Sequence, residues 1–385
     1  FVDNRITLRI TRADNLPQAS LSAPVSSGLT WERSIQSNFG LDMSMLKGRL
    51  DFSGEAYIRD TKDMLTAGEP LPAVYGASTP QENTADLRTT GYELSLGWKD
   101  SVGDFHYGVS VVFSDYVSYI TRFNNPEKLF AKTYWVGQKY GDIWGYHVDG
   151  LFATDEEAKA YAVDQSKVND AQIFPQGLLA GDMKFADIDY SGAIDKGAEK
   201  VGDSGDWKVI GNSQPRYNYG INMNASWKGI DLAVFFQGIG HMDWYPAADA
   251  RSFWFLYARP YQTFIPRDFL TECWSEENPD AYFPRPRGYA AMNANRPLGV
   301  ANDRYLQNIG YLRLKNLTLG YSLPDKMLRK VPVSKLRIYF SGENLFYYAP
   351  GLHGKFVDPE MAMTGGNLRL YPWQKTFTFG IDVTL

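Results

Sequence analysis

The last ten residues of the chain alternate strictly between apolar and polar side chains. Thr376–Leu385 reads T-F-T-F-G-I-D-V-T-L, with Phe377, Phe379, Ile381, Val383 and Leu385 on one face. Alternation with a period of two predicts a β-strand with one apolar and one polar face. Ten residues is also about the length of a tilted strand that crosses a bilayer. A soluble sheet with an inward apolar face and a membrane strand with a lipid-facing one are therefore both possible.

The same alternation predicts further strands along the chain. The segment 31–45 is long for a strand of a soluble sheet. In 311–321 the alternation slips by one residue near Lys315 and Asn316, which predicts a β-bulge. A helical turn is expected at 325–330. The remaining expected strands are 4–12, 50–58, 92–99, 105–114, 216–227, 231–238 and 335–344.

The connections between these strands are of two kinds. Short turns are expected near residues 47, 101 and 228, with a moderate one near 328, whereas long loops cover 121–215 and 239–310 and a polar, proline-bearing segment covers 60–90. Loops of this length are uncommon in compact soluble domains. Short turns at one rim and long loops at the other are typical of outer-membrane barrels. The sequence therefore predicts an all-β, antiparallel transmembrane β-barrel fold whose Phe377, Phe379, Ile381 and Val383 face lipid.

Composition excludes several classes of protein. No run of apolar residues reaches the roughly 18 that a transmembrane helix needs, and the mean hydropathy is −0.35. A net charge of −5 argues against a nucleic-acid partner. Cys273 is the single cysteine, so neither an intrachain disulfide framework nor a thiolate metal cluster is expected. The chain begins at Phe1 without an initiator methionine or a signal peptide, which indicates a processed or partial chain.

No catalytic constellation is visible in the sequence. The HExxH, GxSxG and P-loop motifs are all missing. The four histidines are scattered and are interpreted as ordinary loop or lumen residues: His106, His147, His241 and His353. We therefore predict no catalytic residues and no enzymatic activity.

One acidic segment resembles the first nine positions of a calcium-binding EF-hand loop. Asp187, Asp189, Ser191 and Asp195 could supply side-chain oxygens, Ala193 could supply its carbonyl, and Gly192 could form the turn. The twelfth position is Ala198 instead of the usual glutamate, and Glu199 comes one place late. The alternative is an acidic turn held by hydrogen bonds from its own backbone. A Ca²⁺ site is a prediction with this alternative open, and no other cofactor is expected.

The loop 239–310 is rich in aromatic side chains. Such rings can contact sugar or peptide cargo, or pack the loop against itself or against a partner protein. The candidates for cargo or partner contact are Trp244, Tyr245, Trp254, Tyr257, Trp274 and Tyr282.

Three long blocks of sequence resemble the SusC/RagA family of TonB-dependent outer-membrane transporters. They are 29–65 (L-T-W-E-R-S-I-Q onward), 181–238 (G-D-M-K-F-A-D-I-D-Y-S-G-A-I-D, I-G-N-S-Q-P-R-Y-N-Y-G and F-F-Q-G) and 311–385 (Y-L-R-L-K-N-L-T-L-G-Y-S-L-P, S-G-E-N-L-F and D-P-E). The blocks occur in the family's order across nearly the whole chain. Leu385 departs from the aromatic residue that more often ends such barrels.

The resemblance implies a barrel of about 22 strands, of which residues 1–385 would supply the C-terminal portion, with the N-terminal plug not present in the chain. It also implies the outer membrane of a Gram-negative bacterium, TonB, and a SusD-like surface lipoprotein that closes over extracellular loops 121–215 and 239–310. The implied function is import of a bulky nutrient, most often an oligosaccharide (a glycan) and in some members an oligopeptide. A passive porin or adhesin and a barrel enzyme are the alternatives.

Overall fold

The structure is a computed structural model of the chain. It describes residues 7–10, 17–20, 24–68, 72, 74, 78–169, 177–293, 296–329, 332–353, 356–364, 371 and 373–385. The predicted strand 4–12 therefore lies partly outside the described residues. Its described part is β1 (Thr7–Ile10), which pairs with β2 (Pro17–Ser20) in an antiparallel hairpin.

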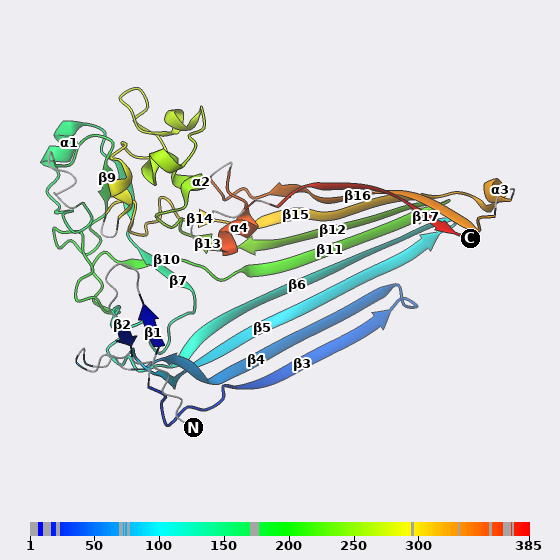
Figure 1. The fold of residues 1–385 in the computed structure, drawn as a ribbon, viewed down its shortest axis with the longest axis horizontal. Helices are drawn as coiled ribbons and strands as arrows, with labels where there is room; N and C mark the ends of the chain where they lie inside the picture. Colours follow the sequence, from blue (N-terminus) through cyan, green and yellow to red (C-terminus); the bar gives the residue numbers. More distant parts are fainter. Residues whose placement is uncertain are drawn as a thin grey trace. The chain divides into compact units, whose positions relative to one another are not determined.

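Nine antiparallel strands form the main sheet (Figure 1). Their order is β17-β16-β15-β12-β11-β6-β5-β4-β3, so each strand lies beside the next long strand of the sequence. This up-and-down arrangement confirms the predicted all-β, antiparallel fold. The strands are β3 (Arg33–Met45), β4 (Leu50–Ala67), β5 (Gln81–Val102), β6 (Phe105–Arg122), β11 (Arg216–Trp227), β12 (Ile230–His241), β15 (Tyr311–Ser322), β16 (Lys335–Tyr348) and β17 (Thr376–Thr384).

The short turns lie where the sequence predicts them. Trp227 pairs with Ile230, which leaves Lys228 and Gly229 as a two-residue hairpin loop. Both residues have positive φ, 48° and 90°, as a type I′ turn requires. Glycine accepts a positive φ without steric cost. The backbone twist of a type I′ turn matches the twist of the two strands that it joins. The turn therefore fixes the register of β11 against β12.

The apolar side chains of neighbouring strands share one face of the sheet. Phe379 pairs with Phe340 and Ile381 pairs with Ile338, whereas Thr378 pairs with Ser341 on the opposite face. The apolar face is open, and Phe379 is 80% exposed. A soluble sheet would cover such a face, whereas the strands of a membrane barrel present it to lipid.

No helix among the described residues is both long enough and apolar enough to cross a bilayer.

The predicted bulge in β15 is confirmed. Between Leu314 and Asn316 the register of β15 shifts against both neighbours. Against β12, Lys315 is the extra residue, whereas against β16 it lies opposite two residues, Asn344 and Leu345. The bulge brings Arg313 onto the polar face, opposite Gln237 of β12. The predicted helical turn after this strand is also present as α3 (Asp325–Leu328).

Strands β4 and β5 are longer than predicted and run into the segment 60–90. The prediction was wrong there because the alternation of apolar residues stops before the strands do. Ion pairs connect the two strands in its place. The Arg88 guanidinium binds Asp60 through both Nε, at 2.8 Å, and a terminal nitrogen, at 2.9 Å, and Lys62 Nζ lies 3.1 Å from Asp86.

The described chain divides into two compact units. One comprises 1–39, 56–91 and 116–140, and the other comprises 40–55, 92–115 and 141–385. The second unit contains the whole of strands β11, β12, β15, β16 and β17 and most of the long loops. Its smaller elements are β7 (Asp142–Gly145), β8 (Val148–Leu151), α1 (Asp155–Ala160), β9 (Met183–Phe185), β10 (Lys208–Asn212), β13 (Asp243–Trp244), α2 (Arg251–Trp254), η2 (Phe255–Tyr257), η3 (Pro260–Gln262), η4 (Phe269–Glu272), η5 (Tyr289–Met292), β14 (Gln307–Asn308) and α4 (Pro359–Thr364).

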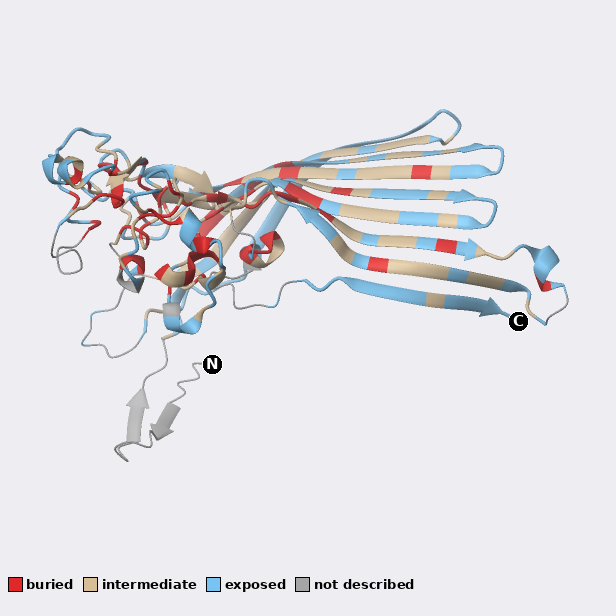
Figure 2. Ribbon diagram, turned by 90° about the horizontal axis from the view of Figure 1, so that it is seen from above, coloured by how far each residue is buried: buried red, intermediate tan, exposed pale blue. Residues whose placement is uncertain are grey.

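The main hydrophobic core cluster of the second unit lies mostly in its loops, and Ile239 and Tyr311 are its contributions from the main sheet (Figure 2). A single cluster of buried side chains includes Tyr146 and Phe185 from the first long loop and Trp254, Tyr257 and Tyr305 from the second. Backbone hydrogen bonds also join the loops, from Tyr146 N to Ala301 O at 2.9 Å and from Asp303 N to Tyr146 O at 3.1 Å. The parts of the two long loops that belong to this unit, 141–215 and 239–310, therefore fold together as one packed body, here called the loop body.

Candidate functional site: the polar wall and the loop body

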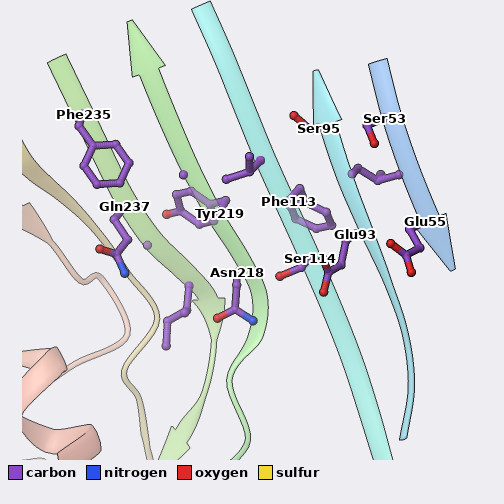
Figure 3. Close-up of a pocket in the computed structure, with 15 residues that line it drawn as sticks. Ser53, Glu55, Glu93, Ser95, Phe113, Ser114, Asn218, Tyr219, Phe235 and Gln237 are labelled. Carbon is purple, nitrogen blue, oxygen red and sulfur yellow. The ribbon is translucent and has the colours of Figure 1, made fainter. Parts of the chain in front are cut away.

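A groove of about 570 Å³ lies along the polar face of the sheet in the second unit (Figure 3). Its polar side chains come from five neighbouring strands. Residues two apart on one strand point to the same face, and residues paired across two strands share that face. Asn218 pairs with Ser114, and Gly220 pairs with Gln237, so these residues lie on one face of the sheet. The labelled polar lining residues are Ser53, Glu55, Glu93, Ser95, Ser114, Asn218 and Gln237.

The groove offers both hydrogen-bond acceptors and donors. Glu55 and Glu93 bring carboxylates, while the amides of Asn218 and Gln237 can donate and accept. Its volume falls within the roughly 300–1,000 Å³ of small-molecule sites. Such a surface suits the hydroxyl or amide groups of a hydrated solute. Alternation in the sequence predicted the polar face but did not indicate which strands would make a groove.

The predicted aromatic contact residues lie mostly inside the loop body. Trp254 and Tyr257 are 0% exposed, and Trp244 and Trp274 are also buried. Tyr245 and Tyr282 are partly buried, and both pack against the same core. This burial favours the alternative that the rings pack the loop on itself.

Hydrogen bonds hold the buried tyrosines of the loop body in place. Tyr245 donates to the carbonyls of Leu298 and Val300, at 3.1 and 2.9 Å. Burial raises the pKa of Tyr257 and Tyr305, and raises that of Tyr282 to about 12. These phenols therefore stay neutral at physiological pH. Tyr257 and Tyr305 donate to backbone carbonyls, whereas the Tyr282 hydroxyl accepts from Gln307 Nε2.

The exposed apolar side chains of the loop body lie elsewhere. Tyr261 is 68% exposed and Leu270 is 65% exposed, and Phe264 and Ile265 lie between them in sequence and are also exposed. Phe356, from the loop after β16, packs edge-to-face on Phe264 with ring centroids 5.2 Å apart. Clusters of exposed apolar side chains on a protein commonly mark interaction sites. The sequence shows these residues to be apolar, but only packing reveals which rings remain outside the core.

A small pocket opens beside this exposed cluster. Its volume is about 180 Å³. The buried rings of Phe253, Phe269 and Phe283 form much of its wall. The remaining lining residues are Phe255, Pro266, Asp268, Glu272, Leu352, His353 and Phe356.

Three of the histidines pair with carboxylates of the loop body. His147 Nδ1 binds Asp303, His241 Nε2 lies 3.1 Å from Asp243, and His353 Nε2 lies 3.2 Å from Glu272. The hydrogen bond to Asp303 raises the pKa of His147, although partial burial opposes the effect. The pairs of His147 and His353 each join segments far apart in the sequence, so we interpret these two histidines as structural contacts.

Cys273 is buried in the loop body. Burial raises the pKa of its thiol, which keeps it protonated and unreactive at neutral pH.

The predicted calcium loop forms a tight acidic turn. Ser191 N donates to Asp187 Oδ1 and to Asp189 Oδ1, both at 3.0 Å, and Gly192 N donates to Asp187 Oδ2 at 2.9 Å. These bonds belong to the alternative interpretation, an acidic turn held by its own backbone. They leave further carboxylate lone pairs for a cation, because each carboxylate oxygen can accept more than one bond.

A third carboxylate, from outside the predicted turn, lies beside two of the predicted ligands. Oxygens of Asp187, Asp189 and Asp206 all lie within 4.8 Å of one another. Asp195 is instead 3.0 Å from Lys167 Nζ and accepts a hydrogen bond from Gly197 N at 2.7 Å. The Gly197 bond and the lysine hold the pKa of Asp195 low, whereas burial raises that of Asp206. Three clustered carboxylates suit a hard cation such as Ca²⁺, and sequence spacing could not find Asp206.

Comparisons with known proteins find that the chain is similar to TonB-dependent receptors. It is 27% identical to TonB-dependent receptor P3 of Formosa agariphila over 93% of this chain and 34% of that relative. It is 23% identical to TonB-dependent receptor SusC of Bacteroides thetaiotaomicron over 100% of this chain and 35% of that relative. The chain thus spans about a third of the length of these relatives. No family model matches the sequence.

The fold is also that of known transporter structures. The structure of the RagAB peptide transporter superposes with a TM-score of 0.70 at 22% identity, over 99% of this chain and 38% of that one. The antiparallel sheet with its open apolar face therefore has the fold of outer-membrane β-barrel transporters. Within that class, the resemblance to the SusC/RagA family is confirmed.

Proposed function

We propose that this chain forms part of the wall and outer loops of an energised outer-membrane importer for a bulky nutrient. The observation that carries the proposal is the 27% identity to a TonB-dependent receptor over 93% of the chain. The open apolar face would lie against outer-membrane lipid of a Gram-negative bacterium, and the polar groove would line the lumen. The named relatives are receptors and transporters, which fits a protein without catalytic activity.

The proposal includes two partners. TonB would supply energy through a region outside this chain, and a SusD-like surface lipoprotein would close over the loop body. The exposed Tyr261 and Leu270 suit a protein interface, since aromatic and apolar side chains are enriched in interface cores. The buried Trp254 and Tyr257 would support that surface from below instead of touching the lipoprotein.

Two cargo classes remain in the proposal. An oligosaccharide is the first, and the hydrogen-bonding groups of the polar groove suit its hydroxyls. An oligopeptide is the alternative, and the superposed structure with a TM-score of 0.70 is named a peptide transporter.

A calcium site stays part of the proposal, with a changed ligand set. Asp187, Asp189 and Asp206 would hold the ion, and Asp195 would stay with Lys167. Bound Ca²⁺ would stiffen the turn by neutralising three carboxylates that otherwise repel one another.

Uptake by a deletion strain tests the function. The deletion strain would be grown with an oligosaccharide or an oligopeptide as its sole source of carbon. Growth would be compared with and without the complete gene restored, and with TonB present or deleted. We expect growth that needs both the gene and TonB. Growth that needs the gene but is unchanged without TonB would support the passive porin instead.

Recovery of the lipoprotein through a tag on the transporter tests the partner. We expect the double variant Tyr261→Ser, Leu270→Ser to lose most of the lipoprotein. Met327→Ser is the matched control, because Met327 is equally exposed, at 66%, on α3 at the short connection between β15 and β16. Equal recovery from both variants would show that the lipoprotein does not dock on this surface.

A further inference from the structure

We propose that the small pocket between η4 and the loop after β16 binds one cationic side chain, an arginine or a lysine, of a peptide cargo. The proposal rests on the proposed import function and names the cargo class that this pocket selects. Six of the residues that line the pocket carry the proposal: Phe253, Phe269, Phe283, Asp268, Glu272 and His353.

The size of the pocket limits what can enter it. Its volume is about 180 Å³, below the roughly 300 Å³ at which small-molecule sites begin. A folded-back sugar chain or a long peptide would not fit. A single side chain, entering end-on from a larger cargo, is of the right size.

The walls of the pocket favour a side chain with an apolar stem. Phe253, Phe269 and Phe283 are each 1–2% exposed, so this part of the wall is firmly packed. Phe356 and Phe264 stand at the exposed side, with Phe255 within 5.8 and 5.6 Å of them. Phenylalanine rings carry no donor or acceptor, so they offer no hydrogen bond to sugar hydroxyls. They do attract the hydrocarbon stem of lysine or arginine, and their faces attract a cation.

The charges of the pocket have one predominant sign. Asp268 and Glu272 are its two carboxylates, and His353 is the one basic side chain among the described residues that line it. Arg267 precedes Asp268 in the sequence but does not line the pocket. A guanidinium or ammonium group therefore meets both aromatic faces and negative charge, whereas an acidic group would be repelled.

The carboxylate of Glu272 is fixed before any ligand arrives. Its Oε2 lies 3.2 Å from His353 Nε2, and the His353 ring stacks on Tyr282 with centroids 3.6 Å apart. The backbone of His353 is held in turn by a hydrogen bond of 2.8 Å to Gln307 Oε1. A preorganised group loses less conformational entropy on binding, which favours affinity.

The experiment uses the complete transporter in detergent and defined peptides. The probe is Ala-Ala-Arg-Ala-Ala, and its matched peptides carry citrulline, which is neutral and nearly isosteric, or norleucine in place of arginine. We expect citrulline to lower the affinity about tenfold, the loss expected for one charge-assisted contact in a partly desolvated site. Equal affinity for the arginine and citrulline peptides would overturn the proposal.

Variants of the protein locate the effect. Glu272→Gln keeps the size and hydrogen bonding of the side chain and should abolish the preference for arginine over citrulline. Glu277→Gln removes an exposed carboxylate of the same loop that does not line the pocket, and should keep the preference. Phe356→Leu keeps an apolar wall without a ring and should weaken the preference. If Glu277→Gln has the same effect as Glu272→Gln, long-range charge and not this pocket is responsible.

Two further arms separate the possible outcomes. If Glu272→Gln lowers recovery of the lipoprotein and leaves peptide affinity unchanged, the pocket holds a partner side chain and the proposal is wrong. Growth without TonB would defeat the import function, yet the binding comparison in detergent would still stand or fall by itself.

Discussion

Arg337 on β16 binds Asp231 on β12 although strand β15 runs between them. The guanidinium Nε lies 2.9 Å from Asp231 Oδ1 and a terminal nitrogen lies 2.6 Å from Oδ2. The residue of β15 that lies between them is Gly320, where a Cβ atom would come within 2.6 Å of both partners. A missing side chain on one strand thus lets its two neighbours join. Arg337 also reaches Asp382 of β17 at 3.0 Å, so the bridge spans four strands.

Gly320→Val should break this bridge by filling the space it crosses. We expect a loss of about 1 kcal/mol in unfolding free energy, since the pair is partly exposed and a β-branched residue otherwise suits a strand. Urea unfolding of the folded barrel in lipid vesicles measures it. In a double-mutant cycle, adding Arg337→Gln to Gly320→Val should cause little further loss of unfolding free energy. Fully additive losses would mean that the glycine does not act through the bridge.

The substitution Phe379→Arg should lower the yield of folded barrel far more than Thr378→Arg does. Phe379 lies on the open apolar face and Thr378 on the polar face. The expected cost is about 2–4 kcal/mol near the middle of a membrane and much less on the lumen side. The yield of folded barrel in vesicles, judged by its shift on an unheated gel, compares the two. Equal yields would reject the assignment of the faces.

Asp358→Ala should release α4 from the wall. Asp358 accepts two hydrogen bonds of 2.7 Å from Arg313, which is only 2% exposed. Glu360 lies 2.7 Å from Arg313 Nε but without hydrogen-bond geometry, and it also binds Lys315. Removing one partner of a buried pair costs about 3–5 kcal/mol.

Hydrogen exchange of the segment 359–364 measures this release. We expect exchange there to quicken strongly in Asp358→Ala and to stay unchanged in Glu276→Ala, an exposed carboxylate of the loop body. Unchanged protection in both would show that Glu360 alone holds the helix.

Terbium luminescence should detect the cation site and separate its ligands. Tb³⁺ takes the oxygen ligands that suit Ca²⁺, and Tyr190 lies within the turn as a sensitiser. Asp206→Asn should weaken binding about tenfold because it removes one of three clustered charges. Asp195→Asn should have little effect, because that carboxylate is engaged with Lys167. The reverse order of effects would restore the ligand set predicted from the sequence.

The contact between His147 and Asp303 should weaken at alkaline pH. The pKa of His147 is raised in the folded protein, so its stabilising effect is complete below the ordinary histidine value of about 6.5 and is lost as the pH rises through the raised value. Nuclear magnetic resonance titration of the histidine measures the shift. Asp303→Asn should return the pKa toward its ordinary value, and an unchanged titration would contradict the role of this pair.

The sequence predicted the wall much better than the loops. Alternation in 376–385 and the Lys228-Gly229 turn act locally, so the strand, its faces and its register follow from the neighbouring residues. The limits of β4 and β5 were missed because ion pairs such as Arg88–Asp60 replace apolar alternation there.

The site depended on contacts that no local pattern contains. Asp206 joins Asp187 across nineteen positions of chain, and His353 meets Glu272 across eighty-one. The aromatic content of 239–310 was visible, but whether a ring such as Trp254 or Tyr261 is buried depends on how the two long loops pack together.

The shared core of the two long loops also limits how such a protein can change over generations. Tyr146 and Phe185 from one loop pack in the same cluster as Trp254 and Tyr305 from the other, and Arg287 binds Asp182 between them. Recombination that exchanged one loop alone would leave half of that core without its complement. Tolerated change in these loops would therefore consist either of small changes at exposed positions or of the joint replacement of 141–310 as one exchanged segment.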